Sequence, residues 1–273
     1  MSDPPAEKWV PLPVRPAATV MLVRDTPEGI KVFLMRRHRG MEFVAGVMVF
    51  PGGGVDDRDR NADIDWHGPP PSWWAQRFGV DEDLALALVC AAARETFEES
   101  GVLFAGTPNT GADPGIVGDA GIYSDARAAL ADHTMAFGDF LRREGLVLRA
   151  DLLRPWANWV TPEAERTRRY DTYFFVGALP EGQRADGDNT ESDCADWTTP
   201  AAALDDFAAA RTFLLPPTWT QLESLADRTV GEVLAVDRHI VTVQPSLSVG
   251  EGNWEIEFFD SDRYNAARAR RAP

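Results

Sequence analysis

Cysteine, lysine and long hydrophobic runs are scarce in this sequence. Two cysteines, Cys90 and Cys194, among 273 residues are too few for a disulfide framework. Lysine occurs only as Lys8 and Lys31, so arginine supplies nearly all of the positive charge. No apolar run approaches the ~20 residues that cross a bilayer, and the acidic, proline-rich start lacks the pattern of a secretory signal. We therefore expect a cytoplasmic protein that does not engage membranes.

Basic residues are outnumbered by acidic ones. The chain carries 43 acidic and 27 basic residues, a net charge of -16. Such a surface repels phosphate backbones, which argues against a nucleic-acid partner. A small anionic substrate is still compatible with this charge, because a bound divalent cation reverses the local field. The 44% hydrophobic and 26% charged content is that of a globular chain and excludes fibrous and wholly disordered classes.

Short apolar and β-branched runs predict more strands than helices. Residues 18–24 and 31–35 flank a turn and predict a hairpin, and a strand at 47–50 stops at Pro51. Further strands are expected at 156–160, 170–178, 194–197, 239–243 and 254–259. Helices are expected between an N-cap at Asp81 and a C-cap at Gly101, and at 124–132, 136–144, 200–210 and 217–227. The pattern favours an α+β fold in which a mixed sheet lies between helices (α/β/α).

The chain is expected to form one main domain. Residues 1–12 are a tail, 13–230 the domain, and 231–273 an extension packed on it. Insertions are expected at about 55–80 and 106–150, the first as a long loop. The three tryptophans of the first insertion are more typical of a packed mini-core than of a ligand site; they are Trp66, Trp73 and Trp74.

Three glutamates share one face of the helix that is expected to end at Gly101. Glu95, Glu98 and Glu99 have i, i+3 and i+4 spacing, and only Arg94 is close enough to offset their repulsion. Most such clusters are solvated acidic faces. Here the other side of the helix is apolar and the cluster follows a strand-ending Phe50–Gly53 turn, which favours a site for a hard divalent cation such as Mg²⁺ or Mn²⁺.

Gly53 and the segment RETFEESGV (94–102) resemble the Nudix box, G-x5-E-x7-R-E-U-x-E-E-x-G-U, in which U is a bulky aliphatic residue. Asp59 stands where the box has its first glutamate, and the 34 residues 60–93 replace the seven-residue spacer. Thr96 stands where an aliphatic residue is usual, which changes packing rather than chemistry. The catalytic half of the motif is complete. The resemblance implies the Nudix fold and the hydrolysis of a nucleoside diphosphate derivative, a small-molecule partner.

A narrower resemblance covers most of the chain. Residues 46–53 fit the G-x3-F-P-G-G element of Nudix coenzyme A diphosphatases, although the upstream element of that group is missing. The peroxisomal coenzyme A diphosphatase subfamily also has a long insertion in its box, and it is similar to this chain at 158–162, 167–175 and 215–217. The residues 271–273 are not a peroxisomal address. The resemblance implies cleavage of coenzyme A or acyl-coenzyme A into 3′,5′-ADP and 4′-phosphopantetheine or its acyl form.

Other functions remain open at this point. The same chemistry would serve ADP-ribose, NADH or another nucleoside diphosphate derivative. A non-catalytic ligand-binding module is a further alternative, although its usual mark, a degraded box, is absent. A homodimer is a further possibility that the family implies.

The resemblance also implies roles for the residues of the box. Glu95, Glu98, Glu99 and the carbonyl of Gly53 would hold the metal, and Arg94 would orient the glutamates. The general base is either a box glutamate, with Glu95 and Glu98 as the predicted catalytic ones, or a carboxylate from a distant loop. Glu191 is the best loop candidate, and the alternative for it is a solvated loop residue.

Substrate contacts are predicted at the ends of strands. Arginine suits phosphate because its planar fork matches phosphate oxygens. The alternative for Arg168 and Arg169 is a turn exposed to water, and at least two of the arginines at 36, 37 and 39 are expected at the surface. The predicted substrate-binding residues are Arg36, Arg37, Phe50, Arg168, Arg169 and Asp171.

Overall fold

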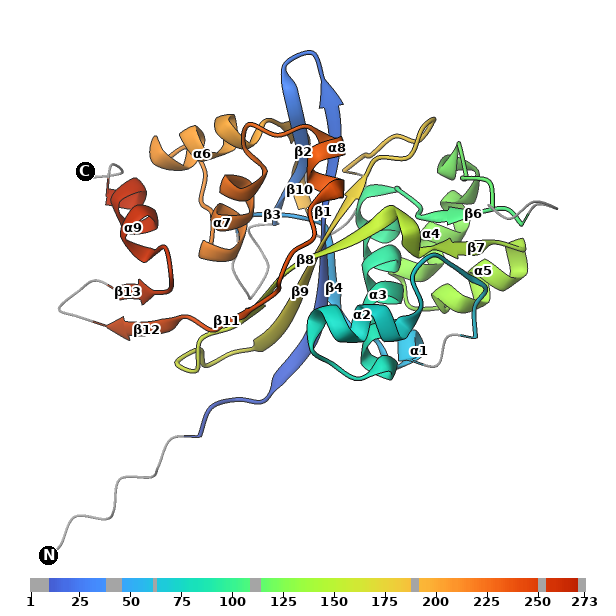
Figure 1. Cartoon of the computed structure of the whole chain (residues 1–273), viewed down its shortest axis with the longest axis horizontal. Coiled ribbons are helices and arrows are strands. Elements are labelled where there is room, and N and C mark those ends of the chain that lie inside the picture. The colour runs from blue at the N-terminus through green and yellow to red at the C-terminus, as the bar shows by residue number, and fades with distance from the viewer. Residues whose placement is uncertain are drawn as a thin grey trace, which may run out of the picture.

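A mixed β-sheet lies between two layers of helices (Figure 1). The computed structural model describes residues 10–37, 46–60, 63–108, 114–187, 192–249 and 254–269. Within these residues the main sheet has eight strands, in the order β10-β2-β1-β9-β8-β11, with β3 paired to β2 and β4 paired to β1. A small sheet of β5, β7 and β6 and a hairpin of β12 and β13 lie beside it. The α+β class and the α/β/α layering expected from the sequence are confirmed.

The strands of the main sheet are β1 (Val14–Thr26), β2 (Gly29–Arg37), β3 (Met48–Val49), β4 (Gly52–Gly54), β8 (Leu153–Val160), β9 (Arg169–Ala178), β10 (Ser192–Thr198) and β11 (Thr242–Val243). The other strands are β5 (Trp66–His67), β6 (Ala105–Gly106), β7 (Val147–Arg149), β12 (Ser246–Val249) and β13 (Trp254–Glu257). The helices are α1 (Asp57–Arg60), α2 (Pro71–Phe78), α3 (Glu82–Ser100), α4 (Ser124–Ala131), α5 (Phe137–Glu144), α6 (Pro200–Ala208), α7 (Pro216–Leu225), α8 (Val230–Ala235) and α9 (Ser261–Ala269), with 3₁₀ turns η1 (Ala120–Tyr123) and η2 (Ala150–Leu152).

Strand β1 organises the sheet. One of its edges pairs in parallel with β9 along ten residues, from Val14 opposite Arg169 to Val23 opposite Ala178. Its other edge is shared: β2 pairs with the end of β1, and the three glycines of β4 pair with residues 17–19. The backbone therefore returns to the centre of the sheet immediately after Phe50 and Pro51. This return places the glycine turn beside helix α3.

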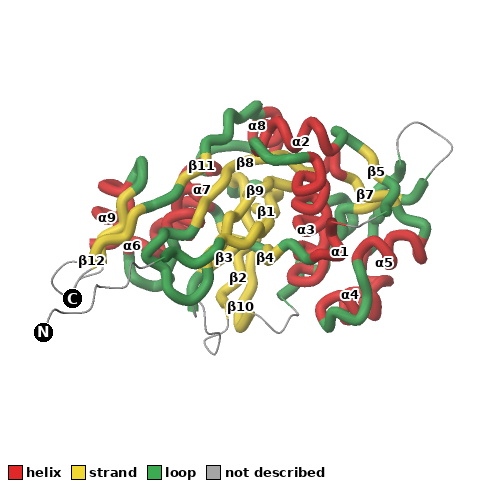
Figure 2. The backbone as a smooth tube through the Cα atoms, turned by 90° about the horizontal axis from the view of Figure 1, so that it is seen from below, coloured by secondary structure: helices red, strands yellow, loops and turns green. Residues whose placement is uncertain are grey.

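Alternating side chains of β1 face two different cores. Val20 and Leu22 pack with α2, α3, α4 and α5, whereas Met21 and Val23 pack with α6, α7 and α9. Figure 2 shows the strands between these two sets of helices. The period of two in a strand is what sends neighbouring residues to opposite faces.

Helix α3 begins and ends where the sequence predicts. The side chain of Asp81 accepts a hydrogen bond of 2.7 Å from the backbone N–H of Leu84, and Gly101 closes the helix with φ of 72°. Residues 87–94 are buried without interruption, because α2, α4 and α5 cover the side of the helix that faces away from the sheet. The end of α3 is thus enclosed.

The first insertion is not the loop expected from the sequence. It contains α1, β5 and α2, and Pro71 occupies the first turn of α2, a position that proline favours. Trp74 is fully buried, and Trp66 and Trp73 pack against the same core, so the predicted tryptophan mini-core is confirmed. The indole N–H groups of Trp66 and Trp74 both donate to the carbonyl of Pro69.

The last part of the chain contributes to the second core. Tyr264 of α9 is fully buried, and its hydroxyl donates to the carbonyl of Leu214 at 2.9 Å. Ile256 of β13 belongs to the same cluster. The elements β12, α8 and α9 were not expected, and the strand expected at 239–243 is reduced to two residues. Over the described residues, none of the helices combines the length and apolar character that a bilayer crossing needs.

Candidate active site

The glutamates of α3 are not a solvated acidic face. Glu99 is 7% exposed, and the side chains of Glu95 and Glu98 are 13% and 9% exposed. Three carboxylates within one and a half turns and largely withdrawn from water repel one another strongly. The structure therefore has to supply compensating groups around them.

Arg94 supplies the positive charge. Its Nη1 atom donates to Glu95 Oε1 at 2.7 Å and to Glu98 Oε1 at 3.3 Å. Its Nε and Nη2 atoms donate to the carboxylate of Asp59 at 3.0 and 2.9 Å, and Nη2 also donates to the carbonyl of Gly54 at 2.9 Å. The guanidinium thus joins α3, α1 and β4, and it holds Glu95 and Glu98 in place.

Asp59 belongs to the site, although it was not among the residues predicted to form it. It is 2% exposed, and besides the two bonds from Arg94 it accepts one from the backbone N–H of Asp56 at 2.9 Å. Its spacing from Gly53 was the available signal, since Asp59 stands where the box has its first glutamate. The extra residues of the spacer lie between Asp59 and Arg94 in sequence, and the fold brings the two side chains back together.

Two glycines of β4 lie directly against the glutamates. The backbone N–H of Gly52 donates to Glu99 Oε2 at 2.7 Å. A Cβ atom at Gly53 would lie 2.6 Å from the carboxylate of Glu95, and one at Gly52 would lie 2.4 Å from the carbonyl oxygen of Ala18. Only glycine allows the backbone to approach this closely.

Burial and mutual repulsion raise the pKa values of Glu95 and Glu98. The pKa of Glu95 is raised to about 7, chiefly by burial and also by the charge of Glu98, against the lowering effect of Arg94. Burial also raises the pKa of Glu98, again opposed by Arg94. The pKa of Arg94 is raised by Glu95, Asp59 and Glu98 in spite of burial, so its guanidinium stays charged. A further cation would release the protons from these carboxylates.

The residues fit a hard divalent cation in their chemistry. They are carboxylate and carbonyl oxygens, the donors that Mg²⁺ and Mn²⁺ prefer. The close approach of Gly53 to Glu95 places the main chain of β4 directly beside the carboxylates. In the part of the chain that the structure describes, no group of three His, Cys, Asp or Glu side chains is already arranged around a common point. The glutamates are instead bound to Arg94 and Gly52.

The candidate general base Glu191 lies outside the described residues. The described part of the loop that precedes it is anchored at the end of α3, where the backbone N–H of Asp186 donates to the carbonyl of Ser100 at 2.9 Å. Arg127 of α4 pairs with Asp186 at 2.8 Å and donates to the carbonyl of Glu98 at 3.0 Å. Sequence reasoning missed Arg127, because nothing in its local pattern distinguishes it from a surface arginine.

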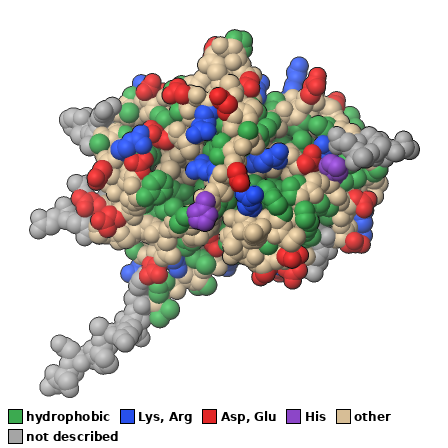
Figure 3. All heavy atoms as spheres, in the orientation of Figure 1, with side chains coloured by type: hydrophobic (Ala, Val, Ile, Leu, Met, Phe, Trp, Pro, Cys, Tyr) green, Lys and Arg blue, Asp and Glu red, His purple; other side chains and the backbone are tan. Residues whose placement is uncertain are grey.

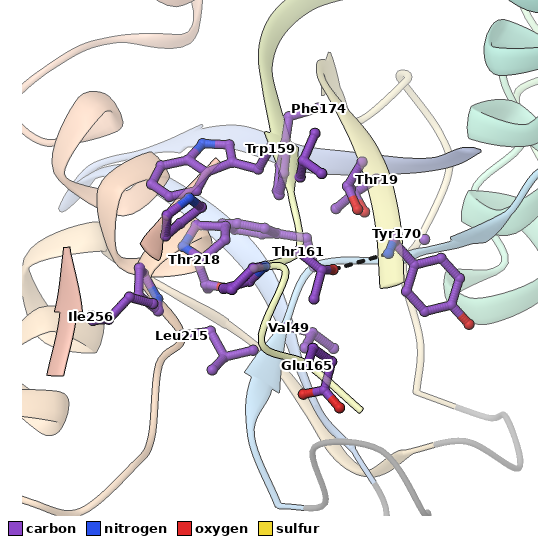
Figure 4. A pocket seen from close by; sticks show the side chains of 18 of the residues that line it. Thr19, Val49, Trp159, Thr161, Glu165, Tyr170, Phe174, Leu215, Thr218 and Ile256 are labelled. Carbon is purple, nitrogen blue, oxygen red and sulfur yellow. Dashed lines mark hydrogen bonds between the residues drawn. The ribbon is translucent and has the colours of Figure 1, made fainter. Parts of the chain in front are cut away.

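A cavity of about 540 Å³ lies on the other side of the glycine turn (Figure 4). Gly52 lines it, although the N–H of the same residue is bonded to Glu99. Trp159, Leu215 and Ile256 form its apolar wall, and Glu165 lies at its edge. All three segments of the coenzyme A diphosphatase resemblance contribute to this lining; the lining residues from them are Trp159, Val160, Thr161, Pro162, Tyr170, Thr172, Phe174, Leu215, Pro216 and Pro217.

Of the predicted substrate-binding residues, Arg37 and Phe50 line this cavity. Arg36 is half-buried on β2 and is not among the lining residues, and Arg168 is exposed before β9. On the face shown in Figure 3, acidic and basic side chains are interspersed rather than segregated.

Two of the predicted substrate-binding residues form hydrogen bonds within the protein. Arg169 is 7% exposed, and its guanidinium donates to the carbonyls of Thr161, Pro162 and Leu12. The Nε and Nη1 groups of Arg169, which were expected to face phosphates, thus donate to main-chain carbonyls.

Asp171 is also bound within the fold. It accepts hydrogen bonds from Asn158 Nδ2 at 2.6 Å and from the Tyr173 hydroxyl at 2.9 Å. Its neighbours Tyr170 and Thr172 line the cavity, whereas Asp171 does not, because successive side chains of a strand point to opposite faces. Arg169 and Asp171 are thus bound within the fold and do not line the cavity, and substrate binding by them stays a prediction.

A glycine turn from a central strand that meets the acidic end of a buried helix is the arrangement of a Nudix hydrolase domain. A crystal structure of a Nudix hydrolase from Alicyclobacillus acidocaldarius superimposes with a TM-score of 0.66 and 27% identity, covering 83% of this chain and 98% of that one. The fold is thereby the Nudix fold.

The family can be stated more narrowly. The model of the NUDT19 Nudix domain matches residues 70–225, and the chain belongs to that family. The acyl-coenzyme A diphosphatase NUDT19 of Homo sapiens is 30% identical over 260 residues, covering 78% of this chain and 65% of the human protein. The protein of the same name from Xenopus laevis is 25% identical over 225 residues, covering 71% of this chain and 59% of the frog protein. The chain thus spans about three-fifths of the length of these two relatives.

Proposed function

We propose that this protein is a Mg²⁺- or Mn²⁺-dependent diphosphatase that cleaves coenzyme A or acyl-coenzyme A into 3′,5′-ADP and 4′-phosphopantetheine or its acyl form. One observation carries the proposal: the buried glutamates of α3 lie against a glycine turn whose other side borders a cavity. That cavity is lined by the segments that resemble coenzyme A diphosphatases. The names of the human and frog relatives support the same substrate class.

The residues of α3 and β4 have distinct parts in this proposal. Glu95, Glu98, Glu99 and the carbonyl of Gly53 would hold the metal. When bound, a divalent metal neutralises the diphosphate and lowers the pKa of the attacking water. Arg94 keeps Glu95 and Glu98 in position, and Asp59 holds the far side of its guanidinium. Arg94 is thus a positioning residue.

Hydrolysis requires that water form a bond to one phosphorus while the bond from that phosphorus to the bridging oxygen breaks. The proton of the water passes to a carboxylate, which we assign to Glu98 or Glu191. Glu98 is well suited to accept it, because its pKa is raised and its carboxylate is held by only one long bond to each oxygen, of 3.3 and 3.4 Å.

The experiment that tests the proposal is a substrate panel. The purified protein is incubated with Mg²⁺ and coenzyme A, dodecanoyl-coenzyme A, ADP-ribose or NADH, and the products are identified by mass spectrometry in H₂¹⁸O. We expect 3′,5′-ADP and a phosphopantetheine product, with ¹⁸O on one of them. Consumption of ADP-ribose or NADH with coenzyme A intact would assign the same chemistry to another substrate. Binding without turnover of any compound would identify a ligand-binding module.

Two further expectations accompany the proposal. A cytoplasmic location and a homodimer stay predictions, which localisation of a tagged chain and sedimentation of the purified protein would test. The substrate is in either case a small nucleoside diphosphate derivative.

A further inference from the structure

The cavity on the α6–α7 face of the sheet has a mainly apolar wall. Trp159, Phe174, Leu215, Leu247 and Ile256 supply most of its wall. A nucleobase edge is recognised through hydrogen bonds, and Asn and Gln are the side chains that pair with adenine. Among the described lining residues there is no Asn or Gln.

Two of the polar side chains of the lining, Thr161 and Glu165, are engaged by the protein itself. Thr161 Oγ1 accepts a hydrogen bond of 3.0 Å from the backbone N–H of Tyr170. Glu165 Oε1 accepts from the backbone N–H groups of Arg166 and Thr167 and from the Thr167 hydroxyl. A buried ligand therefore finds apolar surface here, together with the cationic side chain of Arg37.

The C-terminal hairpin completes this wall. Leu247 of β12 and Ile256 of β13 are opposite one another in the hairpin, and both line the cavity. Phe50 and Gly52 line it from the glycine turn that also contacts Glu99. The cavity thus extends from the glycine turn, which contacts Glu99, to the C-terminal hairpin.

We propose that this cavity binds the acyl chain of an acyl-coenzyme A, and that the C-terminal hairpin determines which chain lengths are accepted. The inference rests on the proposed function and adds the position and the source of its chain specificity. Its volume of about 540 Å³ is in the range of small-molecule sites. Transfer of methylene groups from water into such a wall favours longer chains, by about fourfold in kcat/KM for each added methylene until the cavity is full.

The test compares coenzyme A with its acetyl, hexanoyl and dodecanoyl thioesters. For the unmodified protein we expect kcat/KM to rise with chain length. Leu247→Trp fills the cavity and should lower the ratio of kcat/KM for dodecanoyl-coenzyme A to that for coenzyme A by about tenfold or more. Leu247→Ala enlarges the cavity and should shift the preferred length upward.

Ser248→Trp is the matched control. Ser248 is exposed on the same strand and points away from the lining, so its variant should keep both the chain-length profile and the rate. Thermal unfolding of each variant shows whether the fold is retained. Inhibition by 3′,5′-ADP should be the same in Leu247→Trp and in the unmodified protein.

Three results would overturn the inference. Turnover that does not depend on chain length would show that the chain lies elsewhere, with the proposed function intact. Inhibition by 3′,5′-ADP that weakens in Leu247→Trp as much as acyl-chain preference does would place the nucleotide in the cavity. Absence of turnover for every coenzyme A compound would overturn the proposed function as well.

Discussion

The two faces of the central sheet differ in the number of charged side chains that they bury. On the α3 face, three carboxylates are gathered in a largely buried network around Arg94, and a fourth, Glu99, accepts a hydrogen bond from Gly52. On the α6–α7 face, a cavity is walled by aromatic and aliphatic side chains. The strand-ending turn at Gly52 borders both. In the proposed function, the carboxylates of the α3 face serve the hydrolysis of the diphosphate. The cavity of the α6–α7 face selects which diphosphate compound is bound.

Removing one carboxylate should have the largest effect and should distinguish the role of the α3 face in turnover from that of the cavity in binding. Glu98→Gln should lower kcat by about 10²–10⁴-fold, the range for a group that transfers a proton. Steady-state kinetics on the best substrate of the panel measures this. Titration of the same variant with dodecanoyl-coenzyme A should still show binding, because the cavity is on the other face.

Glu82→Gln is the matched control for that variant. Glu82 is an exposed glutamate in the first turn of the same helix, and its variant should keep full activity. Undiminished turnover in Glu98→Gln would contradict the assignment of the α3 glutamates to the reaction.

The network on the α3 face should depend on Asp59 for its stability. Asp59→Ala leaves part of a buried guanidinium without its partner, and we expect a loss of about 3 kcal/mol in the free energy of unfolding. Urea denaturation followed by circular dichroism measures the loss. Asp63→Ala changes an exposed aspartate of the same insertion and should have no measurable effect. A loss in Asp59→Ala as small as that of the control would show that Glu95 and Glu98 suffice for Arg94.

The glycine turn should matter more for activity than for folding. A methyl group at Gly53 would displace the carboxylate of Glu95, which is the end of a flexible side chain. Gly53→Ala should therefore lower kcat/KM by about 10–100-fold, the usual effect of disturbing a ligand's support, with little change in melting temperature. Gly54→Ala has open space around its Cβ and should behave like the unmodified protein. Equal activity of the two variants would refute the role of the close approach.

The smallest predicted effect concerns pH. Burial raises the pKa of Glu95 from 4.5 to about 7, so the folded state holds a proton that the unfolded state loses earlier. In metal-free protein this contribution to stability is full below pH 4.5 and is lost as the pH rises through 7. Mg²⁺ competes with the same proton, so its affinity should be about tenfold weaker at pH 6 than at pH 8.

Calorimetric titration with Mg²⁺ at pH 6, 7 and 8 measures this dependence. Urea unfolding in the presence of a chelator over the same range measures the accompanying change in stability. Glu95→Gln removes this titrating group and should reduce the pH dependence of stability, and the raised pKa of Glu98 accounts for what remains. A Mg²⁺ affinity that does not change between pH 6 and 8 would show that Glu95 is ionised throughout.

Local patterns were sufficient for most elements of the fold. The caps at Asp81 and Gly101 bound α3, the strands at residues 14–37 form the predicted hairpin, and the helices at 124–131 and 137–144 are where they were expected. The insertion was misjudged because its aspartates and prolines suggest a loop, whereas Trp74 and Phe78 are drawn into the core against β9. Tertiary burial overrode local composition there.

Candidate site residues divide in the same way. The spacing of Glu95, Glu98 and Glu99 and the distance from Gly53 to Asp59 are properties of the sequence, and the structure brings all of them to Arg94 or to β4. The hydrogen bonds of Arg169 could not be predicted from the sequence. The carbonyl groups of Leu12 and Thr161 come within reach of its guanidinium only when the sheet has formed.

By itself, the sequence determined where the acidic turn, the glycine turn and the main helix lie, because caps, glycines and side-chain spacing act over a few residues. Only the tertiary structure decided which face of the sheet each side chain serves. The pairing of β1 with β4 and β9 sets that register over more than a hundred residues. The folded chain brings Leu247 and Ile256 together with Trp159 in one cavity and leaves the half-buried Asp171 outside it. No local pattern encodes contacts between segments so far apart.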